Sequence, residues 1–407
     1  MIASSPSPQR SLRRQRAPGS LLSERLGVAL RLLDVRIAPS DPRITRLERA
    51  CMESDPLADA LVEAFHRYGM REGRALFERA LEQGIASVPD APPELVALFE
   101  QLDAEPAWLD RRQVELGTRA VLRHGTDAMC ALSAVLMSGY LTKYATKPLV
   151  ATGALTELAA KRLDATARFT LDVYTSGDMG RGSAGFKTSV RVRVMHAMVR
   201  RSLLRSPDWR VDPWGIPINQ RDLIATHLQF SVSYLGASCA LGRIDTAEER
   251  EAVMHLWRYV SYLLGVDDAL VPKSFREGLE LLGIFNVTED GPDADGVALA
   301  SALTQHWLES PVARGPFGDH IGDFLIGFCR YFLGKRASDS LGIADTRWKH
   351  AAPTIAAVAL PFELAQQLSP SLRGWAQRRG RARLIREFSA PTPHGVPVYQ
   401  PYALAGR

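Results

Sequence analysis

Cysteine is scarce in this chain, and the few cysteines stand far apart. The 407 residues contain four, and none forms a Cys-x-x-Cys pair. A cysteine zinc site and a c-type haem attachment both need such a pair, so the sequence argues against both. Cys51, Cys130, Cys239 and Cys329 are therefore expected to be small thiols packed in helices.

Charge of one sign is not in large excess either. The chain has 50 basic and 45 acidic side chains, which gives a formal net charge of +5. No basic stripe interleaved with aromatic residues and no nucleic-acid-binding motif accompanies this excess. Nucleic acid is therefore not an expected partner.

Long apolar runs are also missing. The longest, residues 128–141 and 351–360, fall short of the roughly 18 residues that span a bilayer, so no transmembrane helix is expected. Both runs instead predict helices buried in the core. The arginine-rich stretch Arg378–Arg383 leaves peripheral contact with a membrane open, although such stretches more often form solvated surface.

The N-terminus has a twin arginine without the apolar segment that an export signal requires. Arg13-Arg14 would fit such a signal only before an uninterrupted apolar run of about 7–15 residues. Glu24, Arg25 and Arg31 interrupt the apolar residues that follow. We therefore expect an amphipathic helix over 21–33 and a cytoplasmic protein.

The rest of the sequence is typical of one large helical domain. Apolar residues recur at helical spacing almost everywhere, and no alternating pattern persists long enough for a sheet core. We predict an all-α fold with a disordered basic arm over 1–20, a single domain over 21–388 and a proline-rich extended tail over 389–407. Helices are expected near 110–123, 126–140, 151–175, 187–205, 220–241, 246–265, 273–285, 296–308, 319–334 and 354–368.

One histidine in the middle of the chain is a candidate metal ligand. His196 lies in an apolar and basic stretch, residues 189–200, that predicts a helix. Thr166 lies thirty residues upstream, and Arg162 lies four residues before it, so these two share one helix face. If the two helices face each other, the imidazole binds the iron of haem b from one side. Arg162 and Thr166 then lie across the haem, where they orient or polarise bound oxygen.

Two arginines flank this histidine at one helical turn on either side. Arg193 and Arg200 are predicted to pair with the haem propionates. Taken singly, each of these side chains is more often an ordinary helix residue, either solvated or packed. The other histidines show no His-x-x-x-His spacing, and the Glu-x-x-His pair of Glu63 and His66 has no further histidine at metal-ligand spacing, so no second metal site is predicted.

At the same residues the chain resembles a known family, the latex-clearing-protein and MpaB-type oxygenases. A helix bears Arg-Leu-x-x-Thr at 162–166, and thirty residues later His196 stands in the sequence Arg-Val-Met-His-Ala-x-Val-Arg. Residues 214–230 are similar to the family's segment after the histidine. The resemblance covers residues 120–265, more or less.

The resemblance implies a fold, a cofactor and a reaction. The fold would be all-α, with a globin-like core around a buried haem b. The reaction would be that of an oxygenase, which in the best-known members cleaves carbon–carbon double bonds of isoprenoids with dioxygen. His196 would be the proximal iron ligand, and Arg162 and Thr166 would lie on the distal side, where oxygen and the alkene meet.

The chain departs from the family pattern at two positions. Latex-clearing members carry a lysine just before the threonine, where this chain has Ala165, and a glutamate sixteen residues before the arginine, where it has Thr146. Alanine cannot bind iron, and threonine is a poor base near neutral pH. We therefore expect a distal side without a lysine cap and a reaction that need not be rubber cleavage. Because a cytoplasmic protein would not meet polymeric latex, we expect a small apolar substrate, isoprenoid or not.

Two other functions stay open. A peroxide-driven haem oxidase or peroxidase would use a distal arginine equally well. A helical protein that binds haem or lipid without catalysis would explain why no acid or base can be assigned. An isoprenoid synthase is disfavoured, because Asp267-Asp268 is a single acidic pair without the further aspartate that a magnesium–pyrophosphate site needs.

Overall fold

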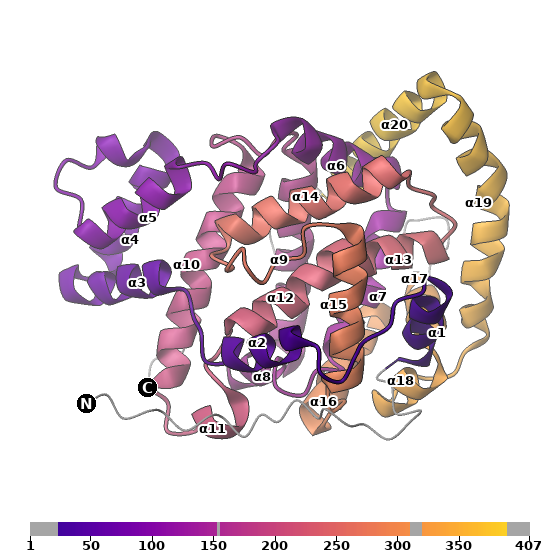
Figure 1. Cartoon of the computed structure of the whole chain (residues 1–407), viewed down its shortest axis with the longest axis horizontal. Helices are drawn as coiled ribbons and strands as arrows, with labels where there is room; N and C mark the ends of the chain where they lie inside the picture. The colour runs from indigo at the N-terminus through magenta and orange to yellow at the C-terminus, as the bar shows by residue number, and fades with distance from the viewer. Residues whose placement is uncertain (1–22, 153–154, 310–319, 389–407) are drawn as a thin grey trace.

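The computed structural model describes residues 23–152, 155–309 and 320–388. Every regular element in these ranges is helical, and none of the described residues forms a β-strand (Figure 1). The prediction of an all-α fold is therefore confirmed. The predicted basic arm over 1–20 and the proline-rich tail over 389–407 lie outside the described residues, so their conformations stay predictions.

The first helices begin at residues suited to cap them. Asp41 and Asp55 each precede a proline, and each carboxylate accepts a hydrogen bond from a backbone N–H of the first helical turn. An acidic N-cap followed by proline is a favoured helix start. The elements of this part are α1 (Glu24–Leu32), α2 (Pro42–Ala50), α3 (Pro56–Tyr68), α4 (Met70–Gln83), the short η1 (Ile85–Ser87) and α5 (Pro93–Asp103).

The central part of the chain agrees with the predicted helices to within about a turn. Its two longest helices, α9 and α10, follow each other along the sequence and carry all of the candidate site residues. The elements are α6 (Arg111–Arg123), α7 (Asp127–Gly139), α8 (Lys147–Ala151), α9 (Leu155–Thr175), α10 (Ala184–Leu204) and α11 (Val211–Trp214).

The later part contains one helix that differs in kind from the prediction. The expected helix over 220–241 is helical throughout, but a π-helical turn replaces its α-helical middle. The elements are α12 (Gln220–Leu228), η2 (Gln229–Ser233), α13 (Tyr234–Ala240), α14 (Ala247–Leu263), α15 (Phe275–Thr288), α16 (Ala294–Glu309), α17 (Ile321–Leu333), α18 (Lys335–Ser340), η4 (Arg347–His350), α19 (Ala351–Leu368) and α20 (Pro370–Phe388).

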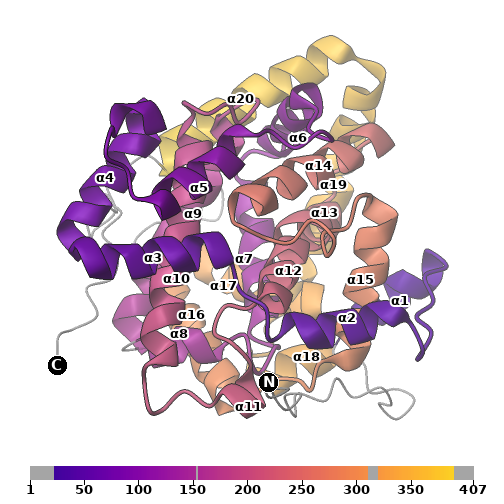
Figure 2. The same cartoon turned by 60° about the vertical axis from the view of Figure 1, so that its left-hand side comes forward.

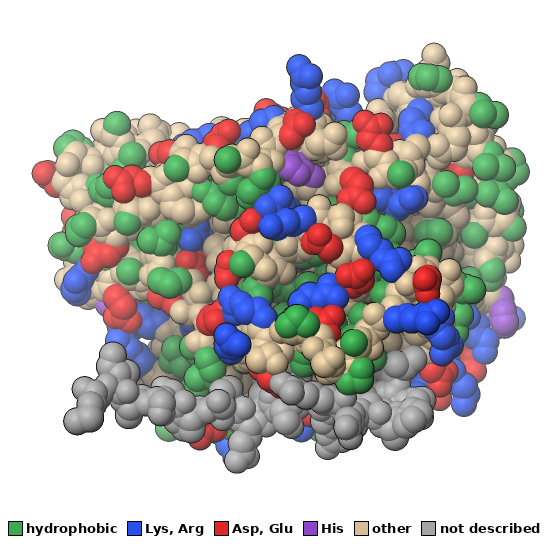
Figure 3. All heavy atoms as spheres, viewed as in Figure 1, with side chains coloured by type: hydrophobic (Ala, Val, Ile, Leu, Met, Phe, Trp, Pro, Cys, Tyr) green, Lys and Arg blue, Asp and Glu red, His purple; other side chains and the backbone are tan. Residues whose placement is uncertain are grey.

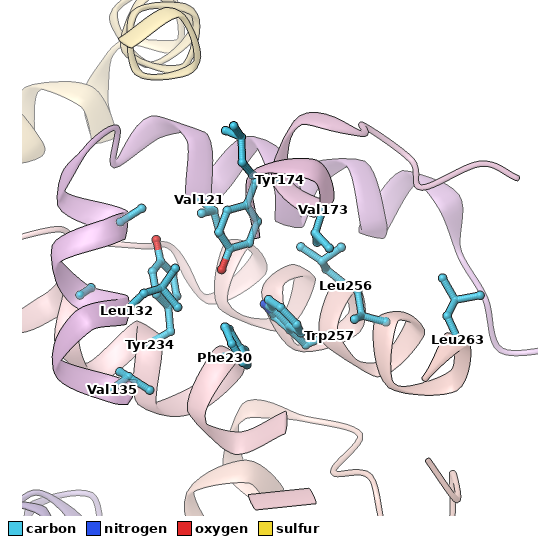
Figure 4. Close-up of a cluster of buried hydrophobic side chains, with 14 of the residues drawn as sticks. Val121, Leu132, Val135, Val173, Tyr174, Phe230, Tyr234, Leu256, Trp257 and Leu263 are labelled. Carbon is cyan, nitrogen blue, oxygen red and sulfur yellow. The ribbon is translucent and has the colours of Figure 1, made fainter. Parts of the chain in front are cut away.

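Aromatic side chains from α9, η2, α13 and α14 meet in the core (Figure 4). The Trp257 ring stacks on Phe230 with the centroids 4.7 Å apart, and it meets Tyr174 edge-on at 6.1 Å. Beside them α6 packs closely on α14, since a Cβ at Gly117 would lie 2.9 Å from the Ala252 carbonyl carbon. This packing fixes α9 against the centre of the molecule.

Two groups of helices lie at opposite ends of the molecule. Helices α3, α4 and α5 form one end beside α10, and α19 with α20 form an arch at the other end (Figure 1). The turned view shows α3 running next to α10 (Figure 2). Among the described residues, no helix is both long and apolar enough to span a bilayer.

Of the two predicted core helices, one is confirmed and one is wrong. In residues 128–141, the apolar side chains of α7 are mostly buried in the core. In residues 351–360 only Ala352 is buried, whereas Val358 is 76% exposed and Leu360 is 43% exposed. Both segments are apolar enough to be buried. Only the packing of the rest of the chain determines that 128–141 is buried and that 351–360 is mostly exposed.

Candidate functional site

Helices α9 and α10 are antiparallel neighbours that touch closely near the turn between them. The Thr188 hydroxyl donates a hydrogen bond of 2.9 Å to Asp172 Oδ2. A Cβ at Gly185 would lie 2.9 Å from both the Asp172 carbonyl oxygen and Val173 Cα, so glycine allows the two backbones to approach. These contacts set the register of the two helices.

His196 lies on the face of α10 that is turned toward α9. Gly185, Ser189, Val192 and His196 follow each other at i, i+4, i+7 and i+11, which is one stripe of an α-helix. Gly185 is the residue that meets the backbone of α9. The stripe that carries the imidazole therefore faces α9.

The register brings Thr166 level with His196 to within about one helical turn. Starting at the Thr188–Asp172 hydrogen bond, Thr166 lies six residues along α9 and His196 eight residues along α10. At about 1.5 Å per residue these steps are ~9 Å and ~12 Å. The two helices are thus neighbours, and the placement of Thr166 across a haem from His196 stays a prediction.

The imidazole of His196 is neutral near pH 7 and has an uncommitted nitrogen. Burial lowers the pKa of His196 from 6.5 to about 4, with a further lowering by Arg200 and an opposing effect of Asp55. Its Nδ1 is buried and has no hydrogen-bond partner among the described residues. A neutral imidazole free to donate a lone pair is what haem iron accepts, so this residue fits the role of protein ligand.

Arg193, one turn before the histidine, belongs to a buried ion pair. Its Nε and Nη2 donate to the two oxygens of Asp55 at 2.6 and 2.9 Å, and its Nη1 donates to Gln101 Oε1 at 2.6 Å. Gly265 leaves room for this pair: its φ is +76°, and a Cβ there would lie 2.6 Å from Arg193 Nε. The sequence predicted a propionate as the partner of this guanidinium, and the structure gives it Asp55 and Gln101.

Arg200, one turn after the histidine, is held in a similar way. Its side chain is buried, pairs with Asp59 of α3, and donates to the backbone oxygens of Pro217 and Ile218 at 3.1 and 3.0 Å. The predicted propionate contact again meets a side chain that already has protein partners. Both arginines tie α10 to its surroundings, and in this way they hold His196 in place.

Thr166 lies on the inward face of α9. Thr166, Phe169 and Val173 are spaced at i, i+3 and i+7, and Val173 is fully buried. The Phe169 ring meets those of Phe230 and Trp257 with centroid distances of 6.3 and 6.2 Å. The threonine hydroxyl therefore belongs to a face that continues into an aromatic and apolar wall.

The remaining positions singled out in the sequence provide little further information about the site. Arg162 belongs to α9, but its side chain lies outside the described residues, so its distal role stays a prediction. Thr146 is buried, and its hydroxyl donates to the Lys143 carbonyl oxygen at 2.9 Å. Ala165 offers only a methyl group. Across the described ranges, no three His, Cys, Asp or Glu side chains come together in a metal-binding group.

Sequence reasoning missed the groups that fix the histidine's helix. Asp55 carried a signal as a helix-capping residue before a proline, but nothing local linked it to Arg193, 138 residues away. Nothing in the sequence around Gly265 or Gln101 indicated a contact with Arg193. Their roles exist only once three distant segments pack together.

The site thus lies in a helical domain, where a neutral histidine with a buried, unpartnered Nδ1 belongs to the stripe of α10 that is turned toward α9. The catalytic-domain profile described as ER-bound oxygenase mpaB/B'/rubber oxygenase matches residues 119–361, which is more than half of the chain. The chain therefore belongs to this oxygenase family. The match contains Arg162, Thr166 and His196, so the resemblance inferred from these residues is confirmed.

Two relatives illustrate the similarity. The rubber oxygenase of Streptomyces sp. (strain K30) is 25% identical over 317 residues, and the match covers 72% of this chain and 70% of that protein. The solved structure of latex clearing protein LCP in the closed state covers 82% of this chain and 91% of its own, with a TM-score of 0.57 and 20% identity. The structural likeness supports a shared all-α fold.

Proposed function

We propose that this protein is a haem b-dependent oxygenase acting on a small hydrophobic substrate, with oxidative cleavage of a carbon–carbon double bond as its reaction. The observation that carries the proposal is the His196 imidazole: it is neutral near pH 7, its Nδ1 is buried without a hydrogen-bond partner among the described residues, and it lies on the stripe of α10 that is turned toward α9. The membership of the chain in an oxygenase family supports the reaction class.

His196 is the protein ligand to iron in this proposal. Because its pKa is about 4, the ring needs no deprotonation to bind a metal at neutral pH. The ion pairs of Arg193 with Asp55 and of Arg200 with Asp59 hold the helix on both sides of the ligand. The ring is therefore preorganised, and little side-chain entropy is lost when it binds.

Haem, when bound, supplies the redox chemistry that activates dioxygen. The residues across from His196 orient the reactants: Thr166 presents a hydroxyl that donates a hydrogen bond, and Arg162 presents a permanent positive charge. Ala165 adds no ligand on this side. Phe169, with Phe230 and Trp257 behind it, excludes water and favours an apolar substrate.

The substrate class follows from this apolar wall and from the named relative, a rubber oxygenase. An alkene offers no polar group to recognise, so shape and burial select it. A small isoprenoid is the expected substrate class, since it combines an apolar body with the double bond to be cleaved.

The proposal is tested by titrating purified protein with haemin and recording the Soret band before and after reduction. We expect one haem per chain in the wild type and loss or strong alteration of the band in His196→Ala. His227 provides a matched control, because it is also buried with a pKa lowered to about 4 by burial. Its Nδ1 lies 2.8 Å from Ser261 Oγ, and its Nε2 is buried without a hydrogen-bond partner among the described residues. His227→Ala therefore removes a second neutral imidazole with one unpartnered ring nitrogen.

Equal spectra in wild type and His196→Ala, with circular dichroism showing both folded, would refute His196 as the ligand. Equal loss of the band in both histidine variants would show that the effect is general destabilisation. Stoichiometric haem with no consumption of any alkene under dioxygen would favour a non-catalytic carrier.

A further inference from the structure

The arch formed by α19 and α20 exposes an unusual amount of apolar surface. Half of the large hydrophobic side chains that are exposed in the described ranges belong to these two helices. Figure 3 shows hydrophobic side chains gathered along the edge of the molecule over α19. We call the following set the arch face: Val358, Leu360, Phe362, Leu364, Leu368 and Trp375.

The arch is firmly attached, so this exposure is not a sign of loose packing. Glu363 of α19 is fully buried and accepts hydrogen bonds from Arg123 Nη1 at 2.6 Å and Arg243 Nη1 at 2.7 Å. Burial opposes ionisation of Glu363, but Arg123 and Arg243 lower its pKa overall. In α20, Gly380 packs against the backbone of Leu122 so closely that a side chain would not fit.

The outward stripe of α20 combines an aromatic ring with basic side chains. Trp375, Arg378, Arg379, Ile385 and Arg386 are all exposed and follow at i, i+3, i+4, i+10 and i+11, which is one side of a helix. The opposite stripe of α20, which contains Gly380, is buried.

Trp375 joins this stripe to the arch face. Its ring meets Phe362 of α19 edge-on with the centroids 6.2 Å apart, and the Arg379 guanidinium lies 5.2 Å from the Trp375 ring centre. Phe362, Trp375 and Arg379 are therefore adjacent parts of one surface.

The charge of this surface is mainly positive. Residues 351–388 contain six arginines and two acidic residues, Glu363 and Glu387. The Glu363 carboxylate is buried and pairs with Arg123, so its charge does not balance the exposed arginines. An apolar face bordered by arginine and tryptophan is the pattern of helices that lie in the headgroup region of an anionic membrane.

The family match gives no reason for this surface. It ends at residue 361, within α19, so the second half of α19 and all of α20 lie beyond the catalytic domain that the family shares. Ala376 and Leu384 of α20 are buried, whereas the apolar side chains of the arch face are exposed and lie outside the core.

We propose that the arch face, with Arg378, Arg379 and Arg386, docks this protein on the surface of an anionic lipid bilayer. The apolar side chains enter the boundary between headgroups and acyl chains, and the arginines bind the lipid phosphates. The docking is peripheral, and it does not depend on the iron site.

The test is co-sedimentation of the full-length protein with vesicles of phosphatidylcholine alone or mixed with phosphatidylglycerol. We expect binding to the anionic vesicles, weak binding to the neutral ones, and release by high salt. The double variant Arg378→Gln with Arg379→Gln lowers partitioning roughly 25-fold, since each basic residue near an anionic surface contributes about fivefold. The matched control is Arg71→Gln with Arg79→Gln, two exposed arginines of α4.

A second pair of variants tests the contribution of the apolar side chains to membrane binding. Leu368 on the arch and Leu32 on α1 are 87% and 82% exposed. We expect Leu368→Ser to weaken binding several-fold and Leu32→Ser to leave it unchanged.

Three outcomes would overturn the proposal. The first is that the wild type does not bind anionic vesicles. The second is that the arch variants and their controls lose vesicle binding equally. The third is that the protein does not bind vesicles but self-associates, and that Leu368→Ser abolishes this self-association. The last outcome would assign the arch face to a second copy of the chain.

Discussion

The protonation of His196 gives the sharpest prediction about this protein before any cofactor is added. The pKa of the ring is about 4 in the folded chain, against an ordinary value of 6.5. Between these values the unfolded chain binds a proton that the folded chain does not. Stability therefore falls as the pH drops from 6.5 toward 4. At pH 5 the loss from this single group is about 2 kcal/mol, at 1.36 kcal/mol per pKa unit.

The perturbation is His196→Gln, which keeps a polar side chain but removes the titration. Urea unfolding of the haem-free protein, followed by circular dichroism, is measured at pH 7 and pH 5. We expect the free energy of unfolding to fall by about 2 kcal/mol less in the variant than in the wild type. His227→Gln serves for comparison, since the pKa of His227 is also lowered to about 4 and the variant is expected to behave alike.

An unchanged dependence on pH in His196→Gln would refute the reasoning. It would mean that the imidazole is hydrated or charged in the folded protein at pH 5. Such a ring would also lose the feature that makes it a ready ligand for iron.

Three further outcomes are expected. Haemin affinity of the wild type, measured by spectroscopic titration, changes less than about twofold between pH 7 and pH 5, because His196 is already neutral there. A pKa of 6.5 would instead weaken binding about 25-fold over the same range. Arg193→Gln lowers the free energy of unfolding by about 3–5 kcal/mol in urea titrations, because it leaves the buried Asp55 carboxylate without its cation. A loss below about 1 kcal/mol would contradict the stabilising role of the ion pair. Gly265→Ala lowers the free energy of unfolding by more than about 1 kcal/mol, because alanine disfavours a φ of +76° and its Cβ would clash with Asp55. An unchanged thermal midpoint of unfolding would contradict this prediction.

Much of the site's framework could be predicted from the sequence because helices are specified locally. The apolar periodicity that predicted helices over 151–175 and 187–205 depends on residues three and four apart, and both helices are present. A short connection between two long helices favours antiparallel neighbours. The facing of Thr166 and His196 was therefore within reach of the sequence.

The partners of the charged residues could not be predicted in this way. Arg193 and Arg200 stand one turn from a candidate ligand, and spacing alone cannot distinguish a propionate from a carboxylate of another helix. The structure pairs them with Asp55 and Asp59 of α3, about 140 residues away in the sequence. Ion pairs depend on which helices pack together, and that information is not local.

The sequence by itself determined an all-α chain with one histidine spaced correctly from a threonine and an arginine. It did so because helical periodicity and motif spacing are properties of neighbouring residues. Only the tertiary structure decided that 128–141 is core whereas 351–360 lies on an exposed arch, although both runs are apolar. Burial is a competition among all apolar segments for one interior, and its result depends on the packing of the whole chain.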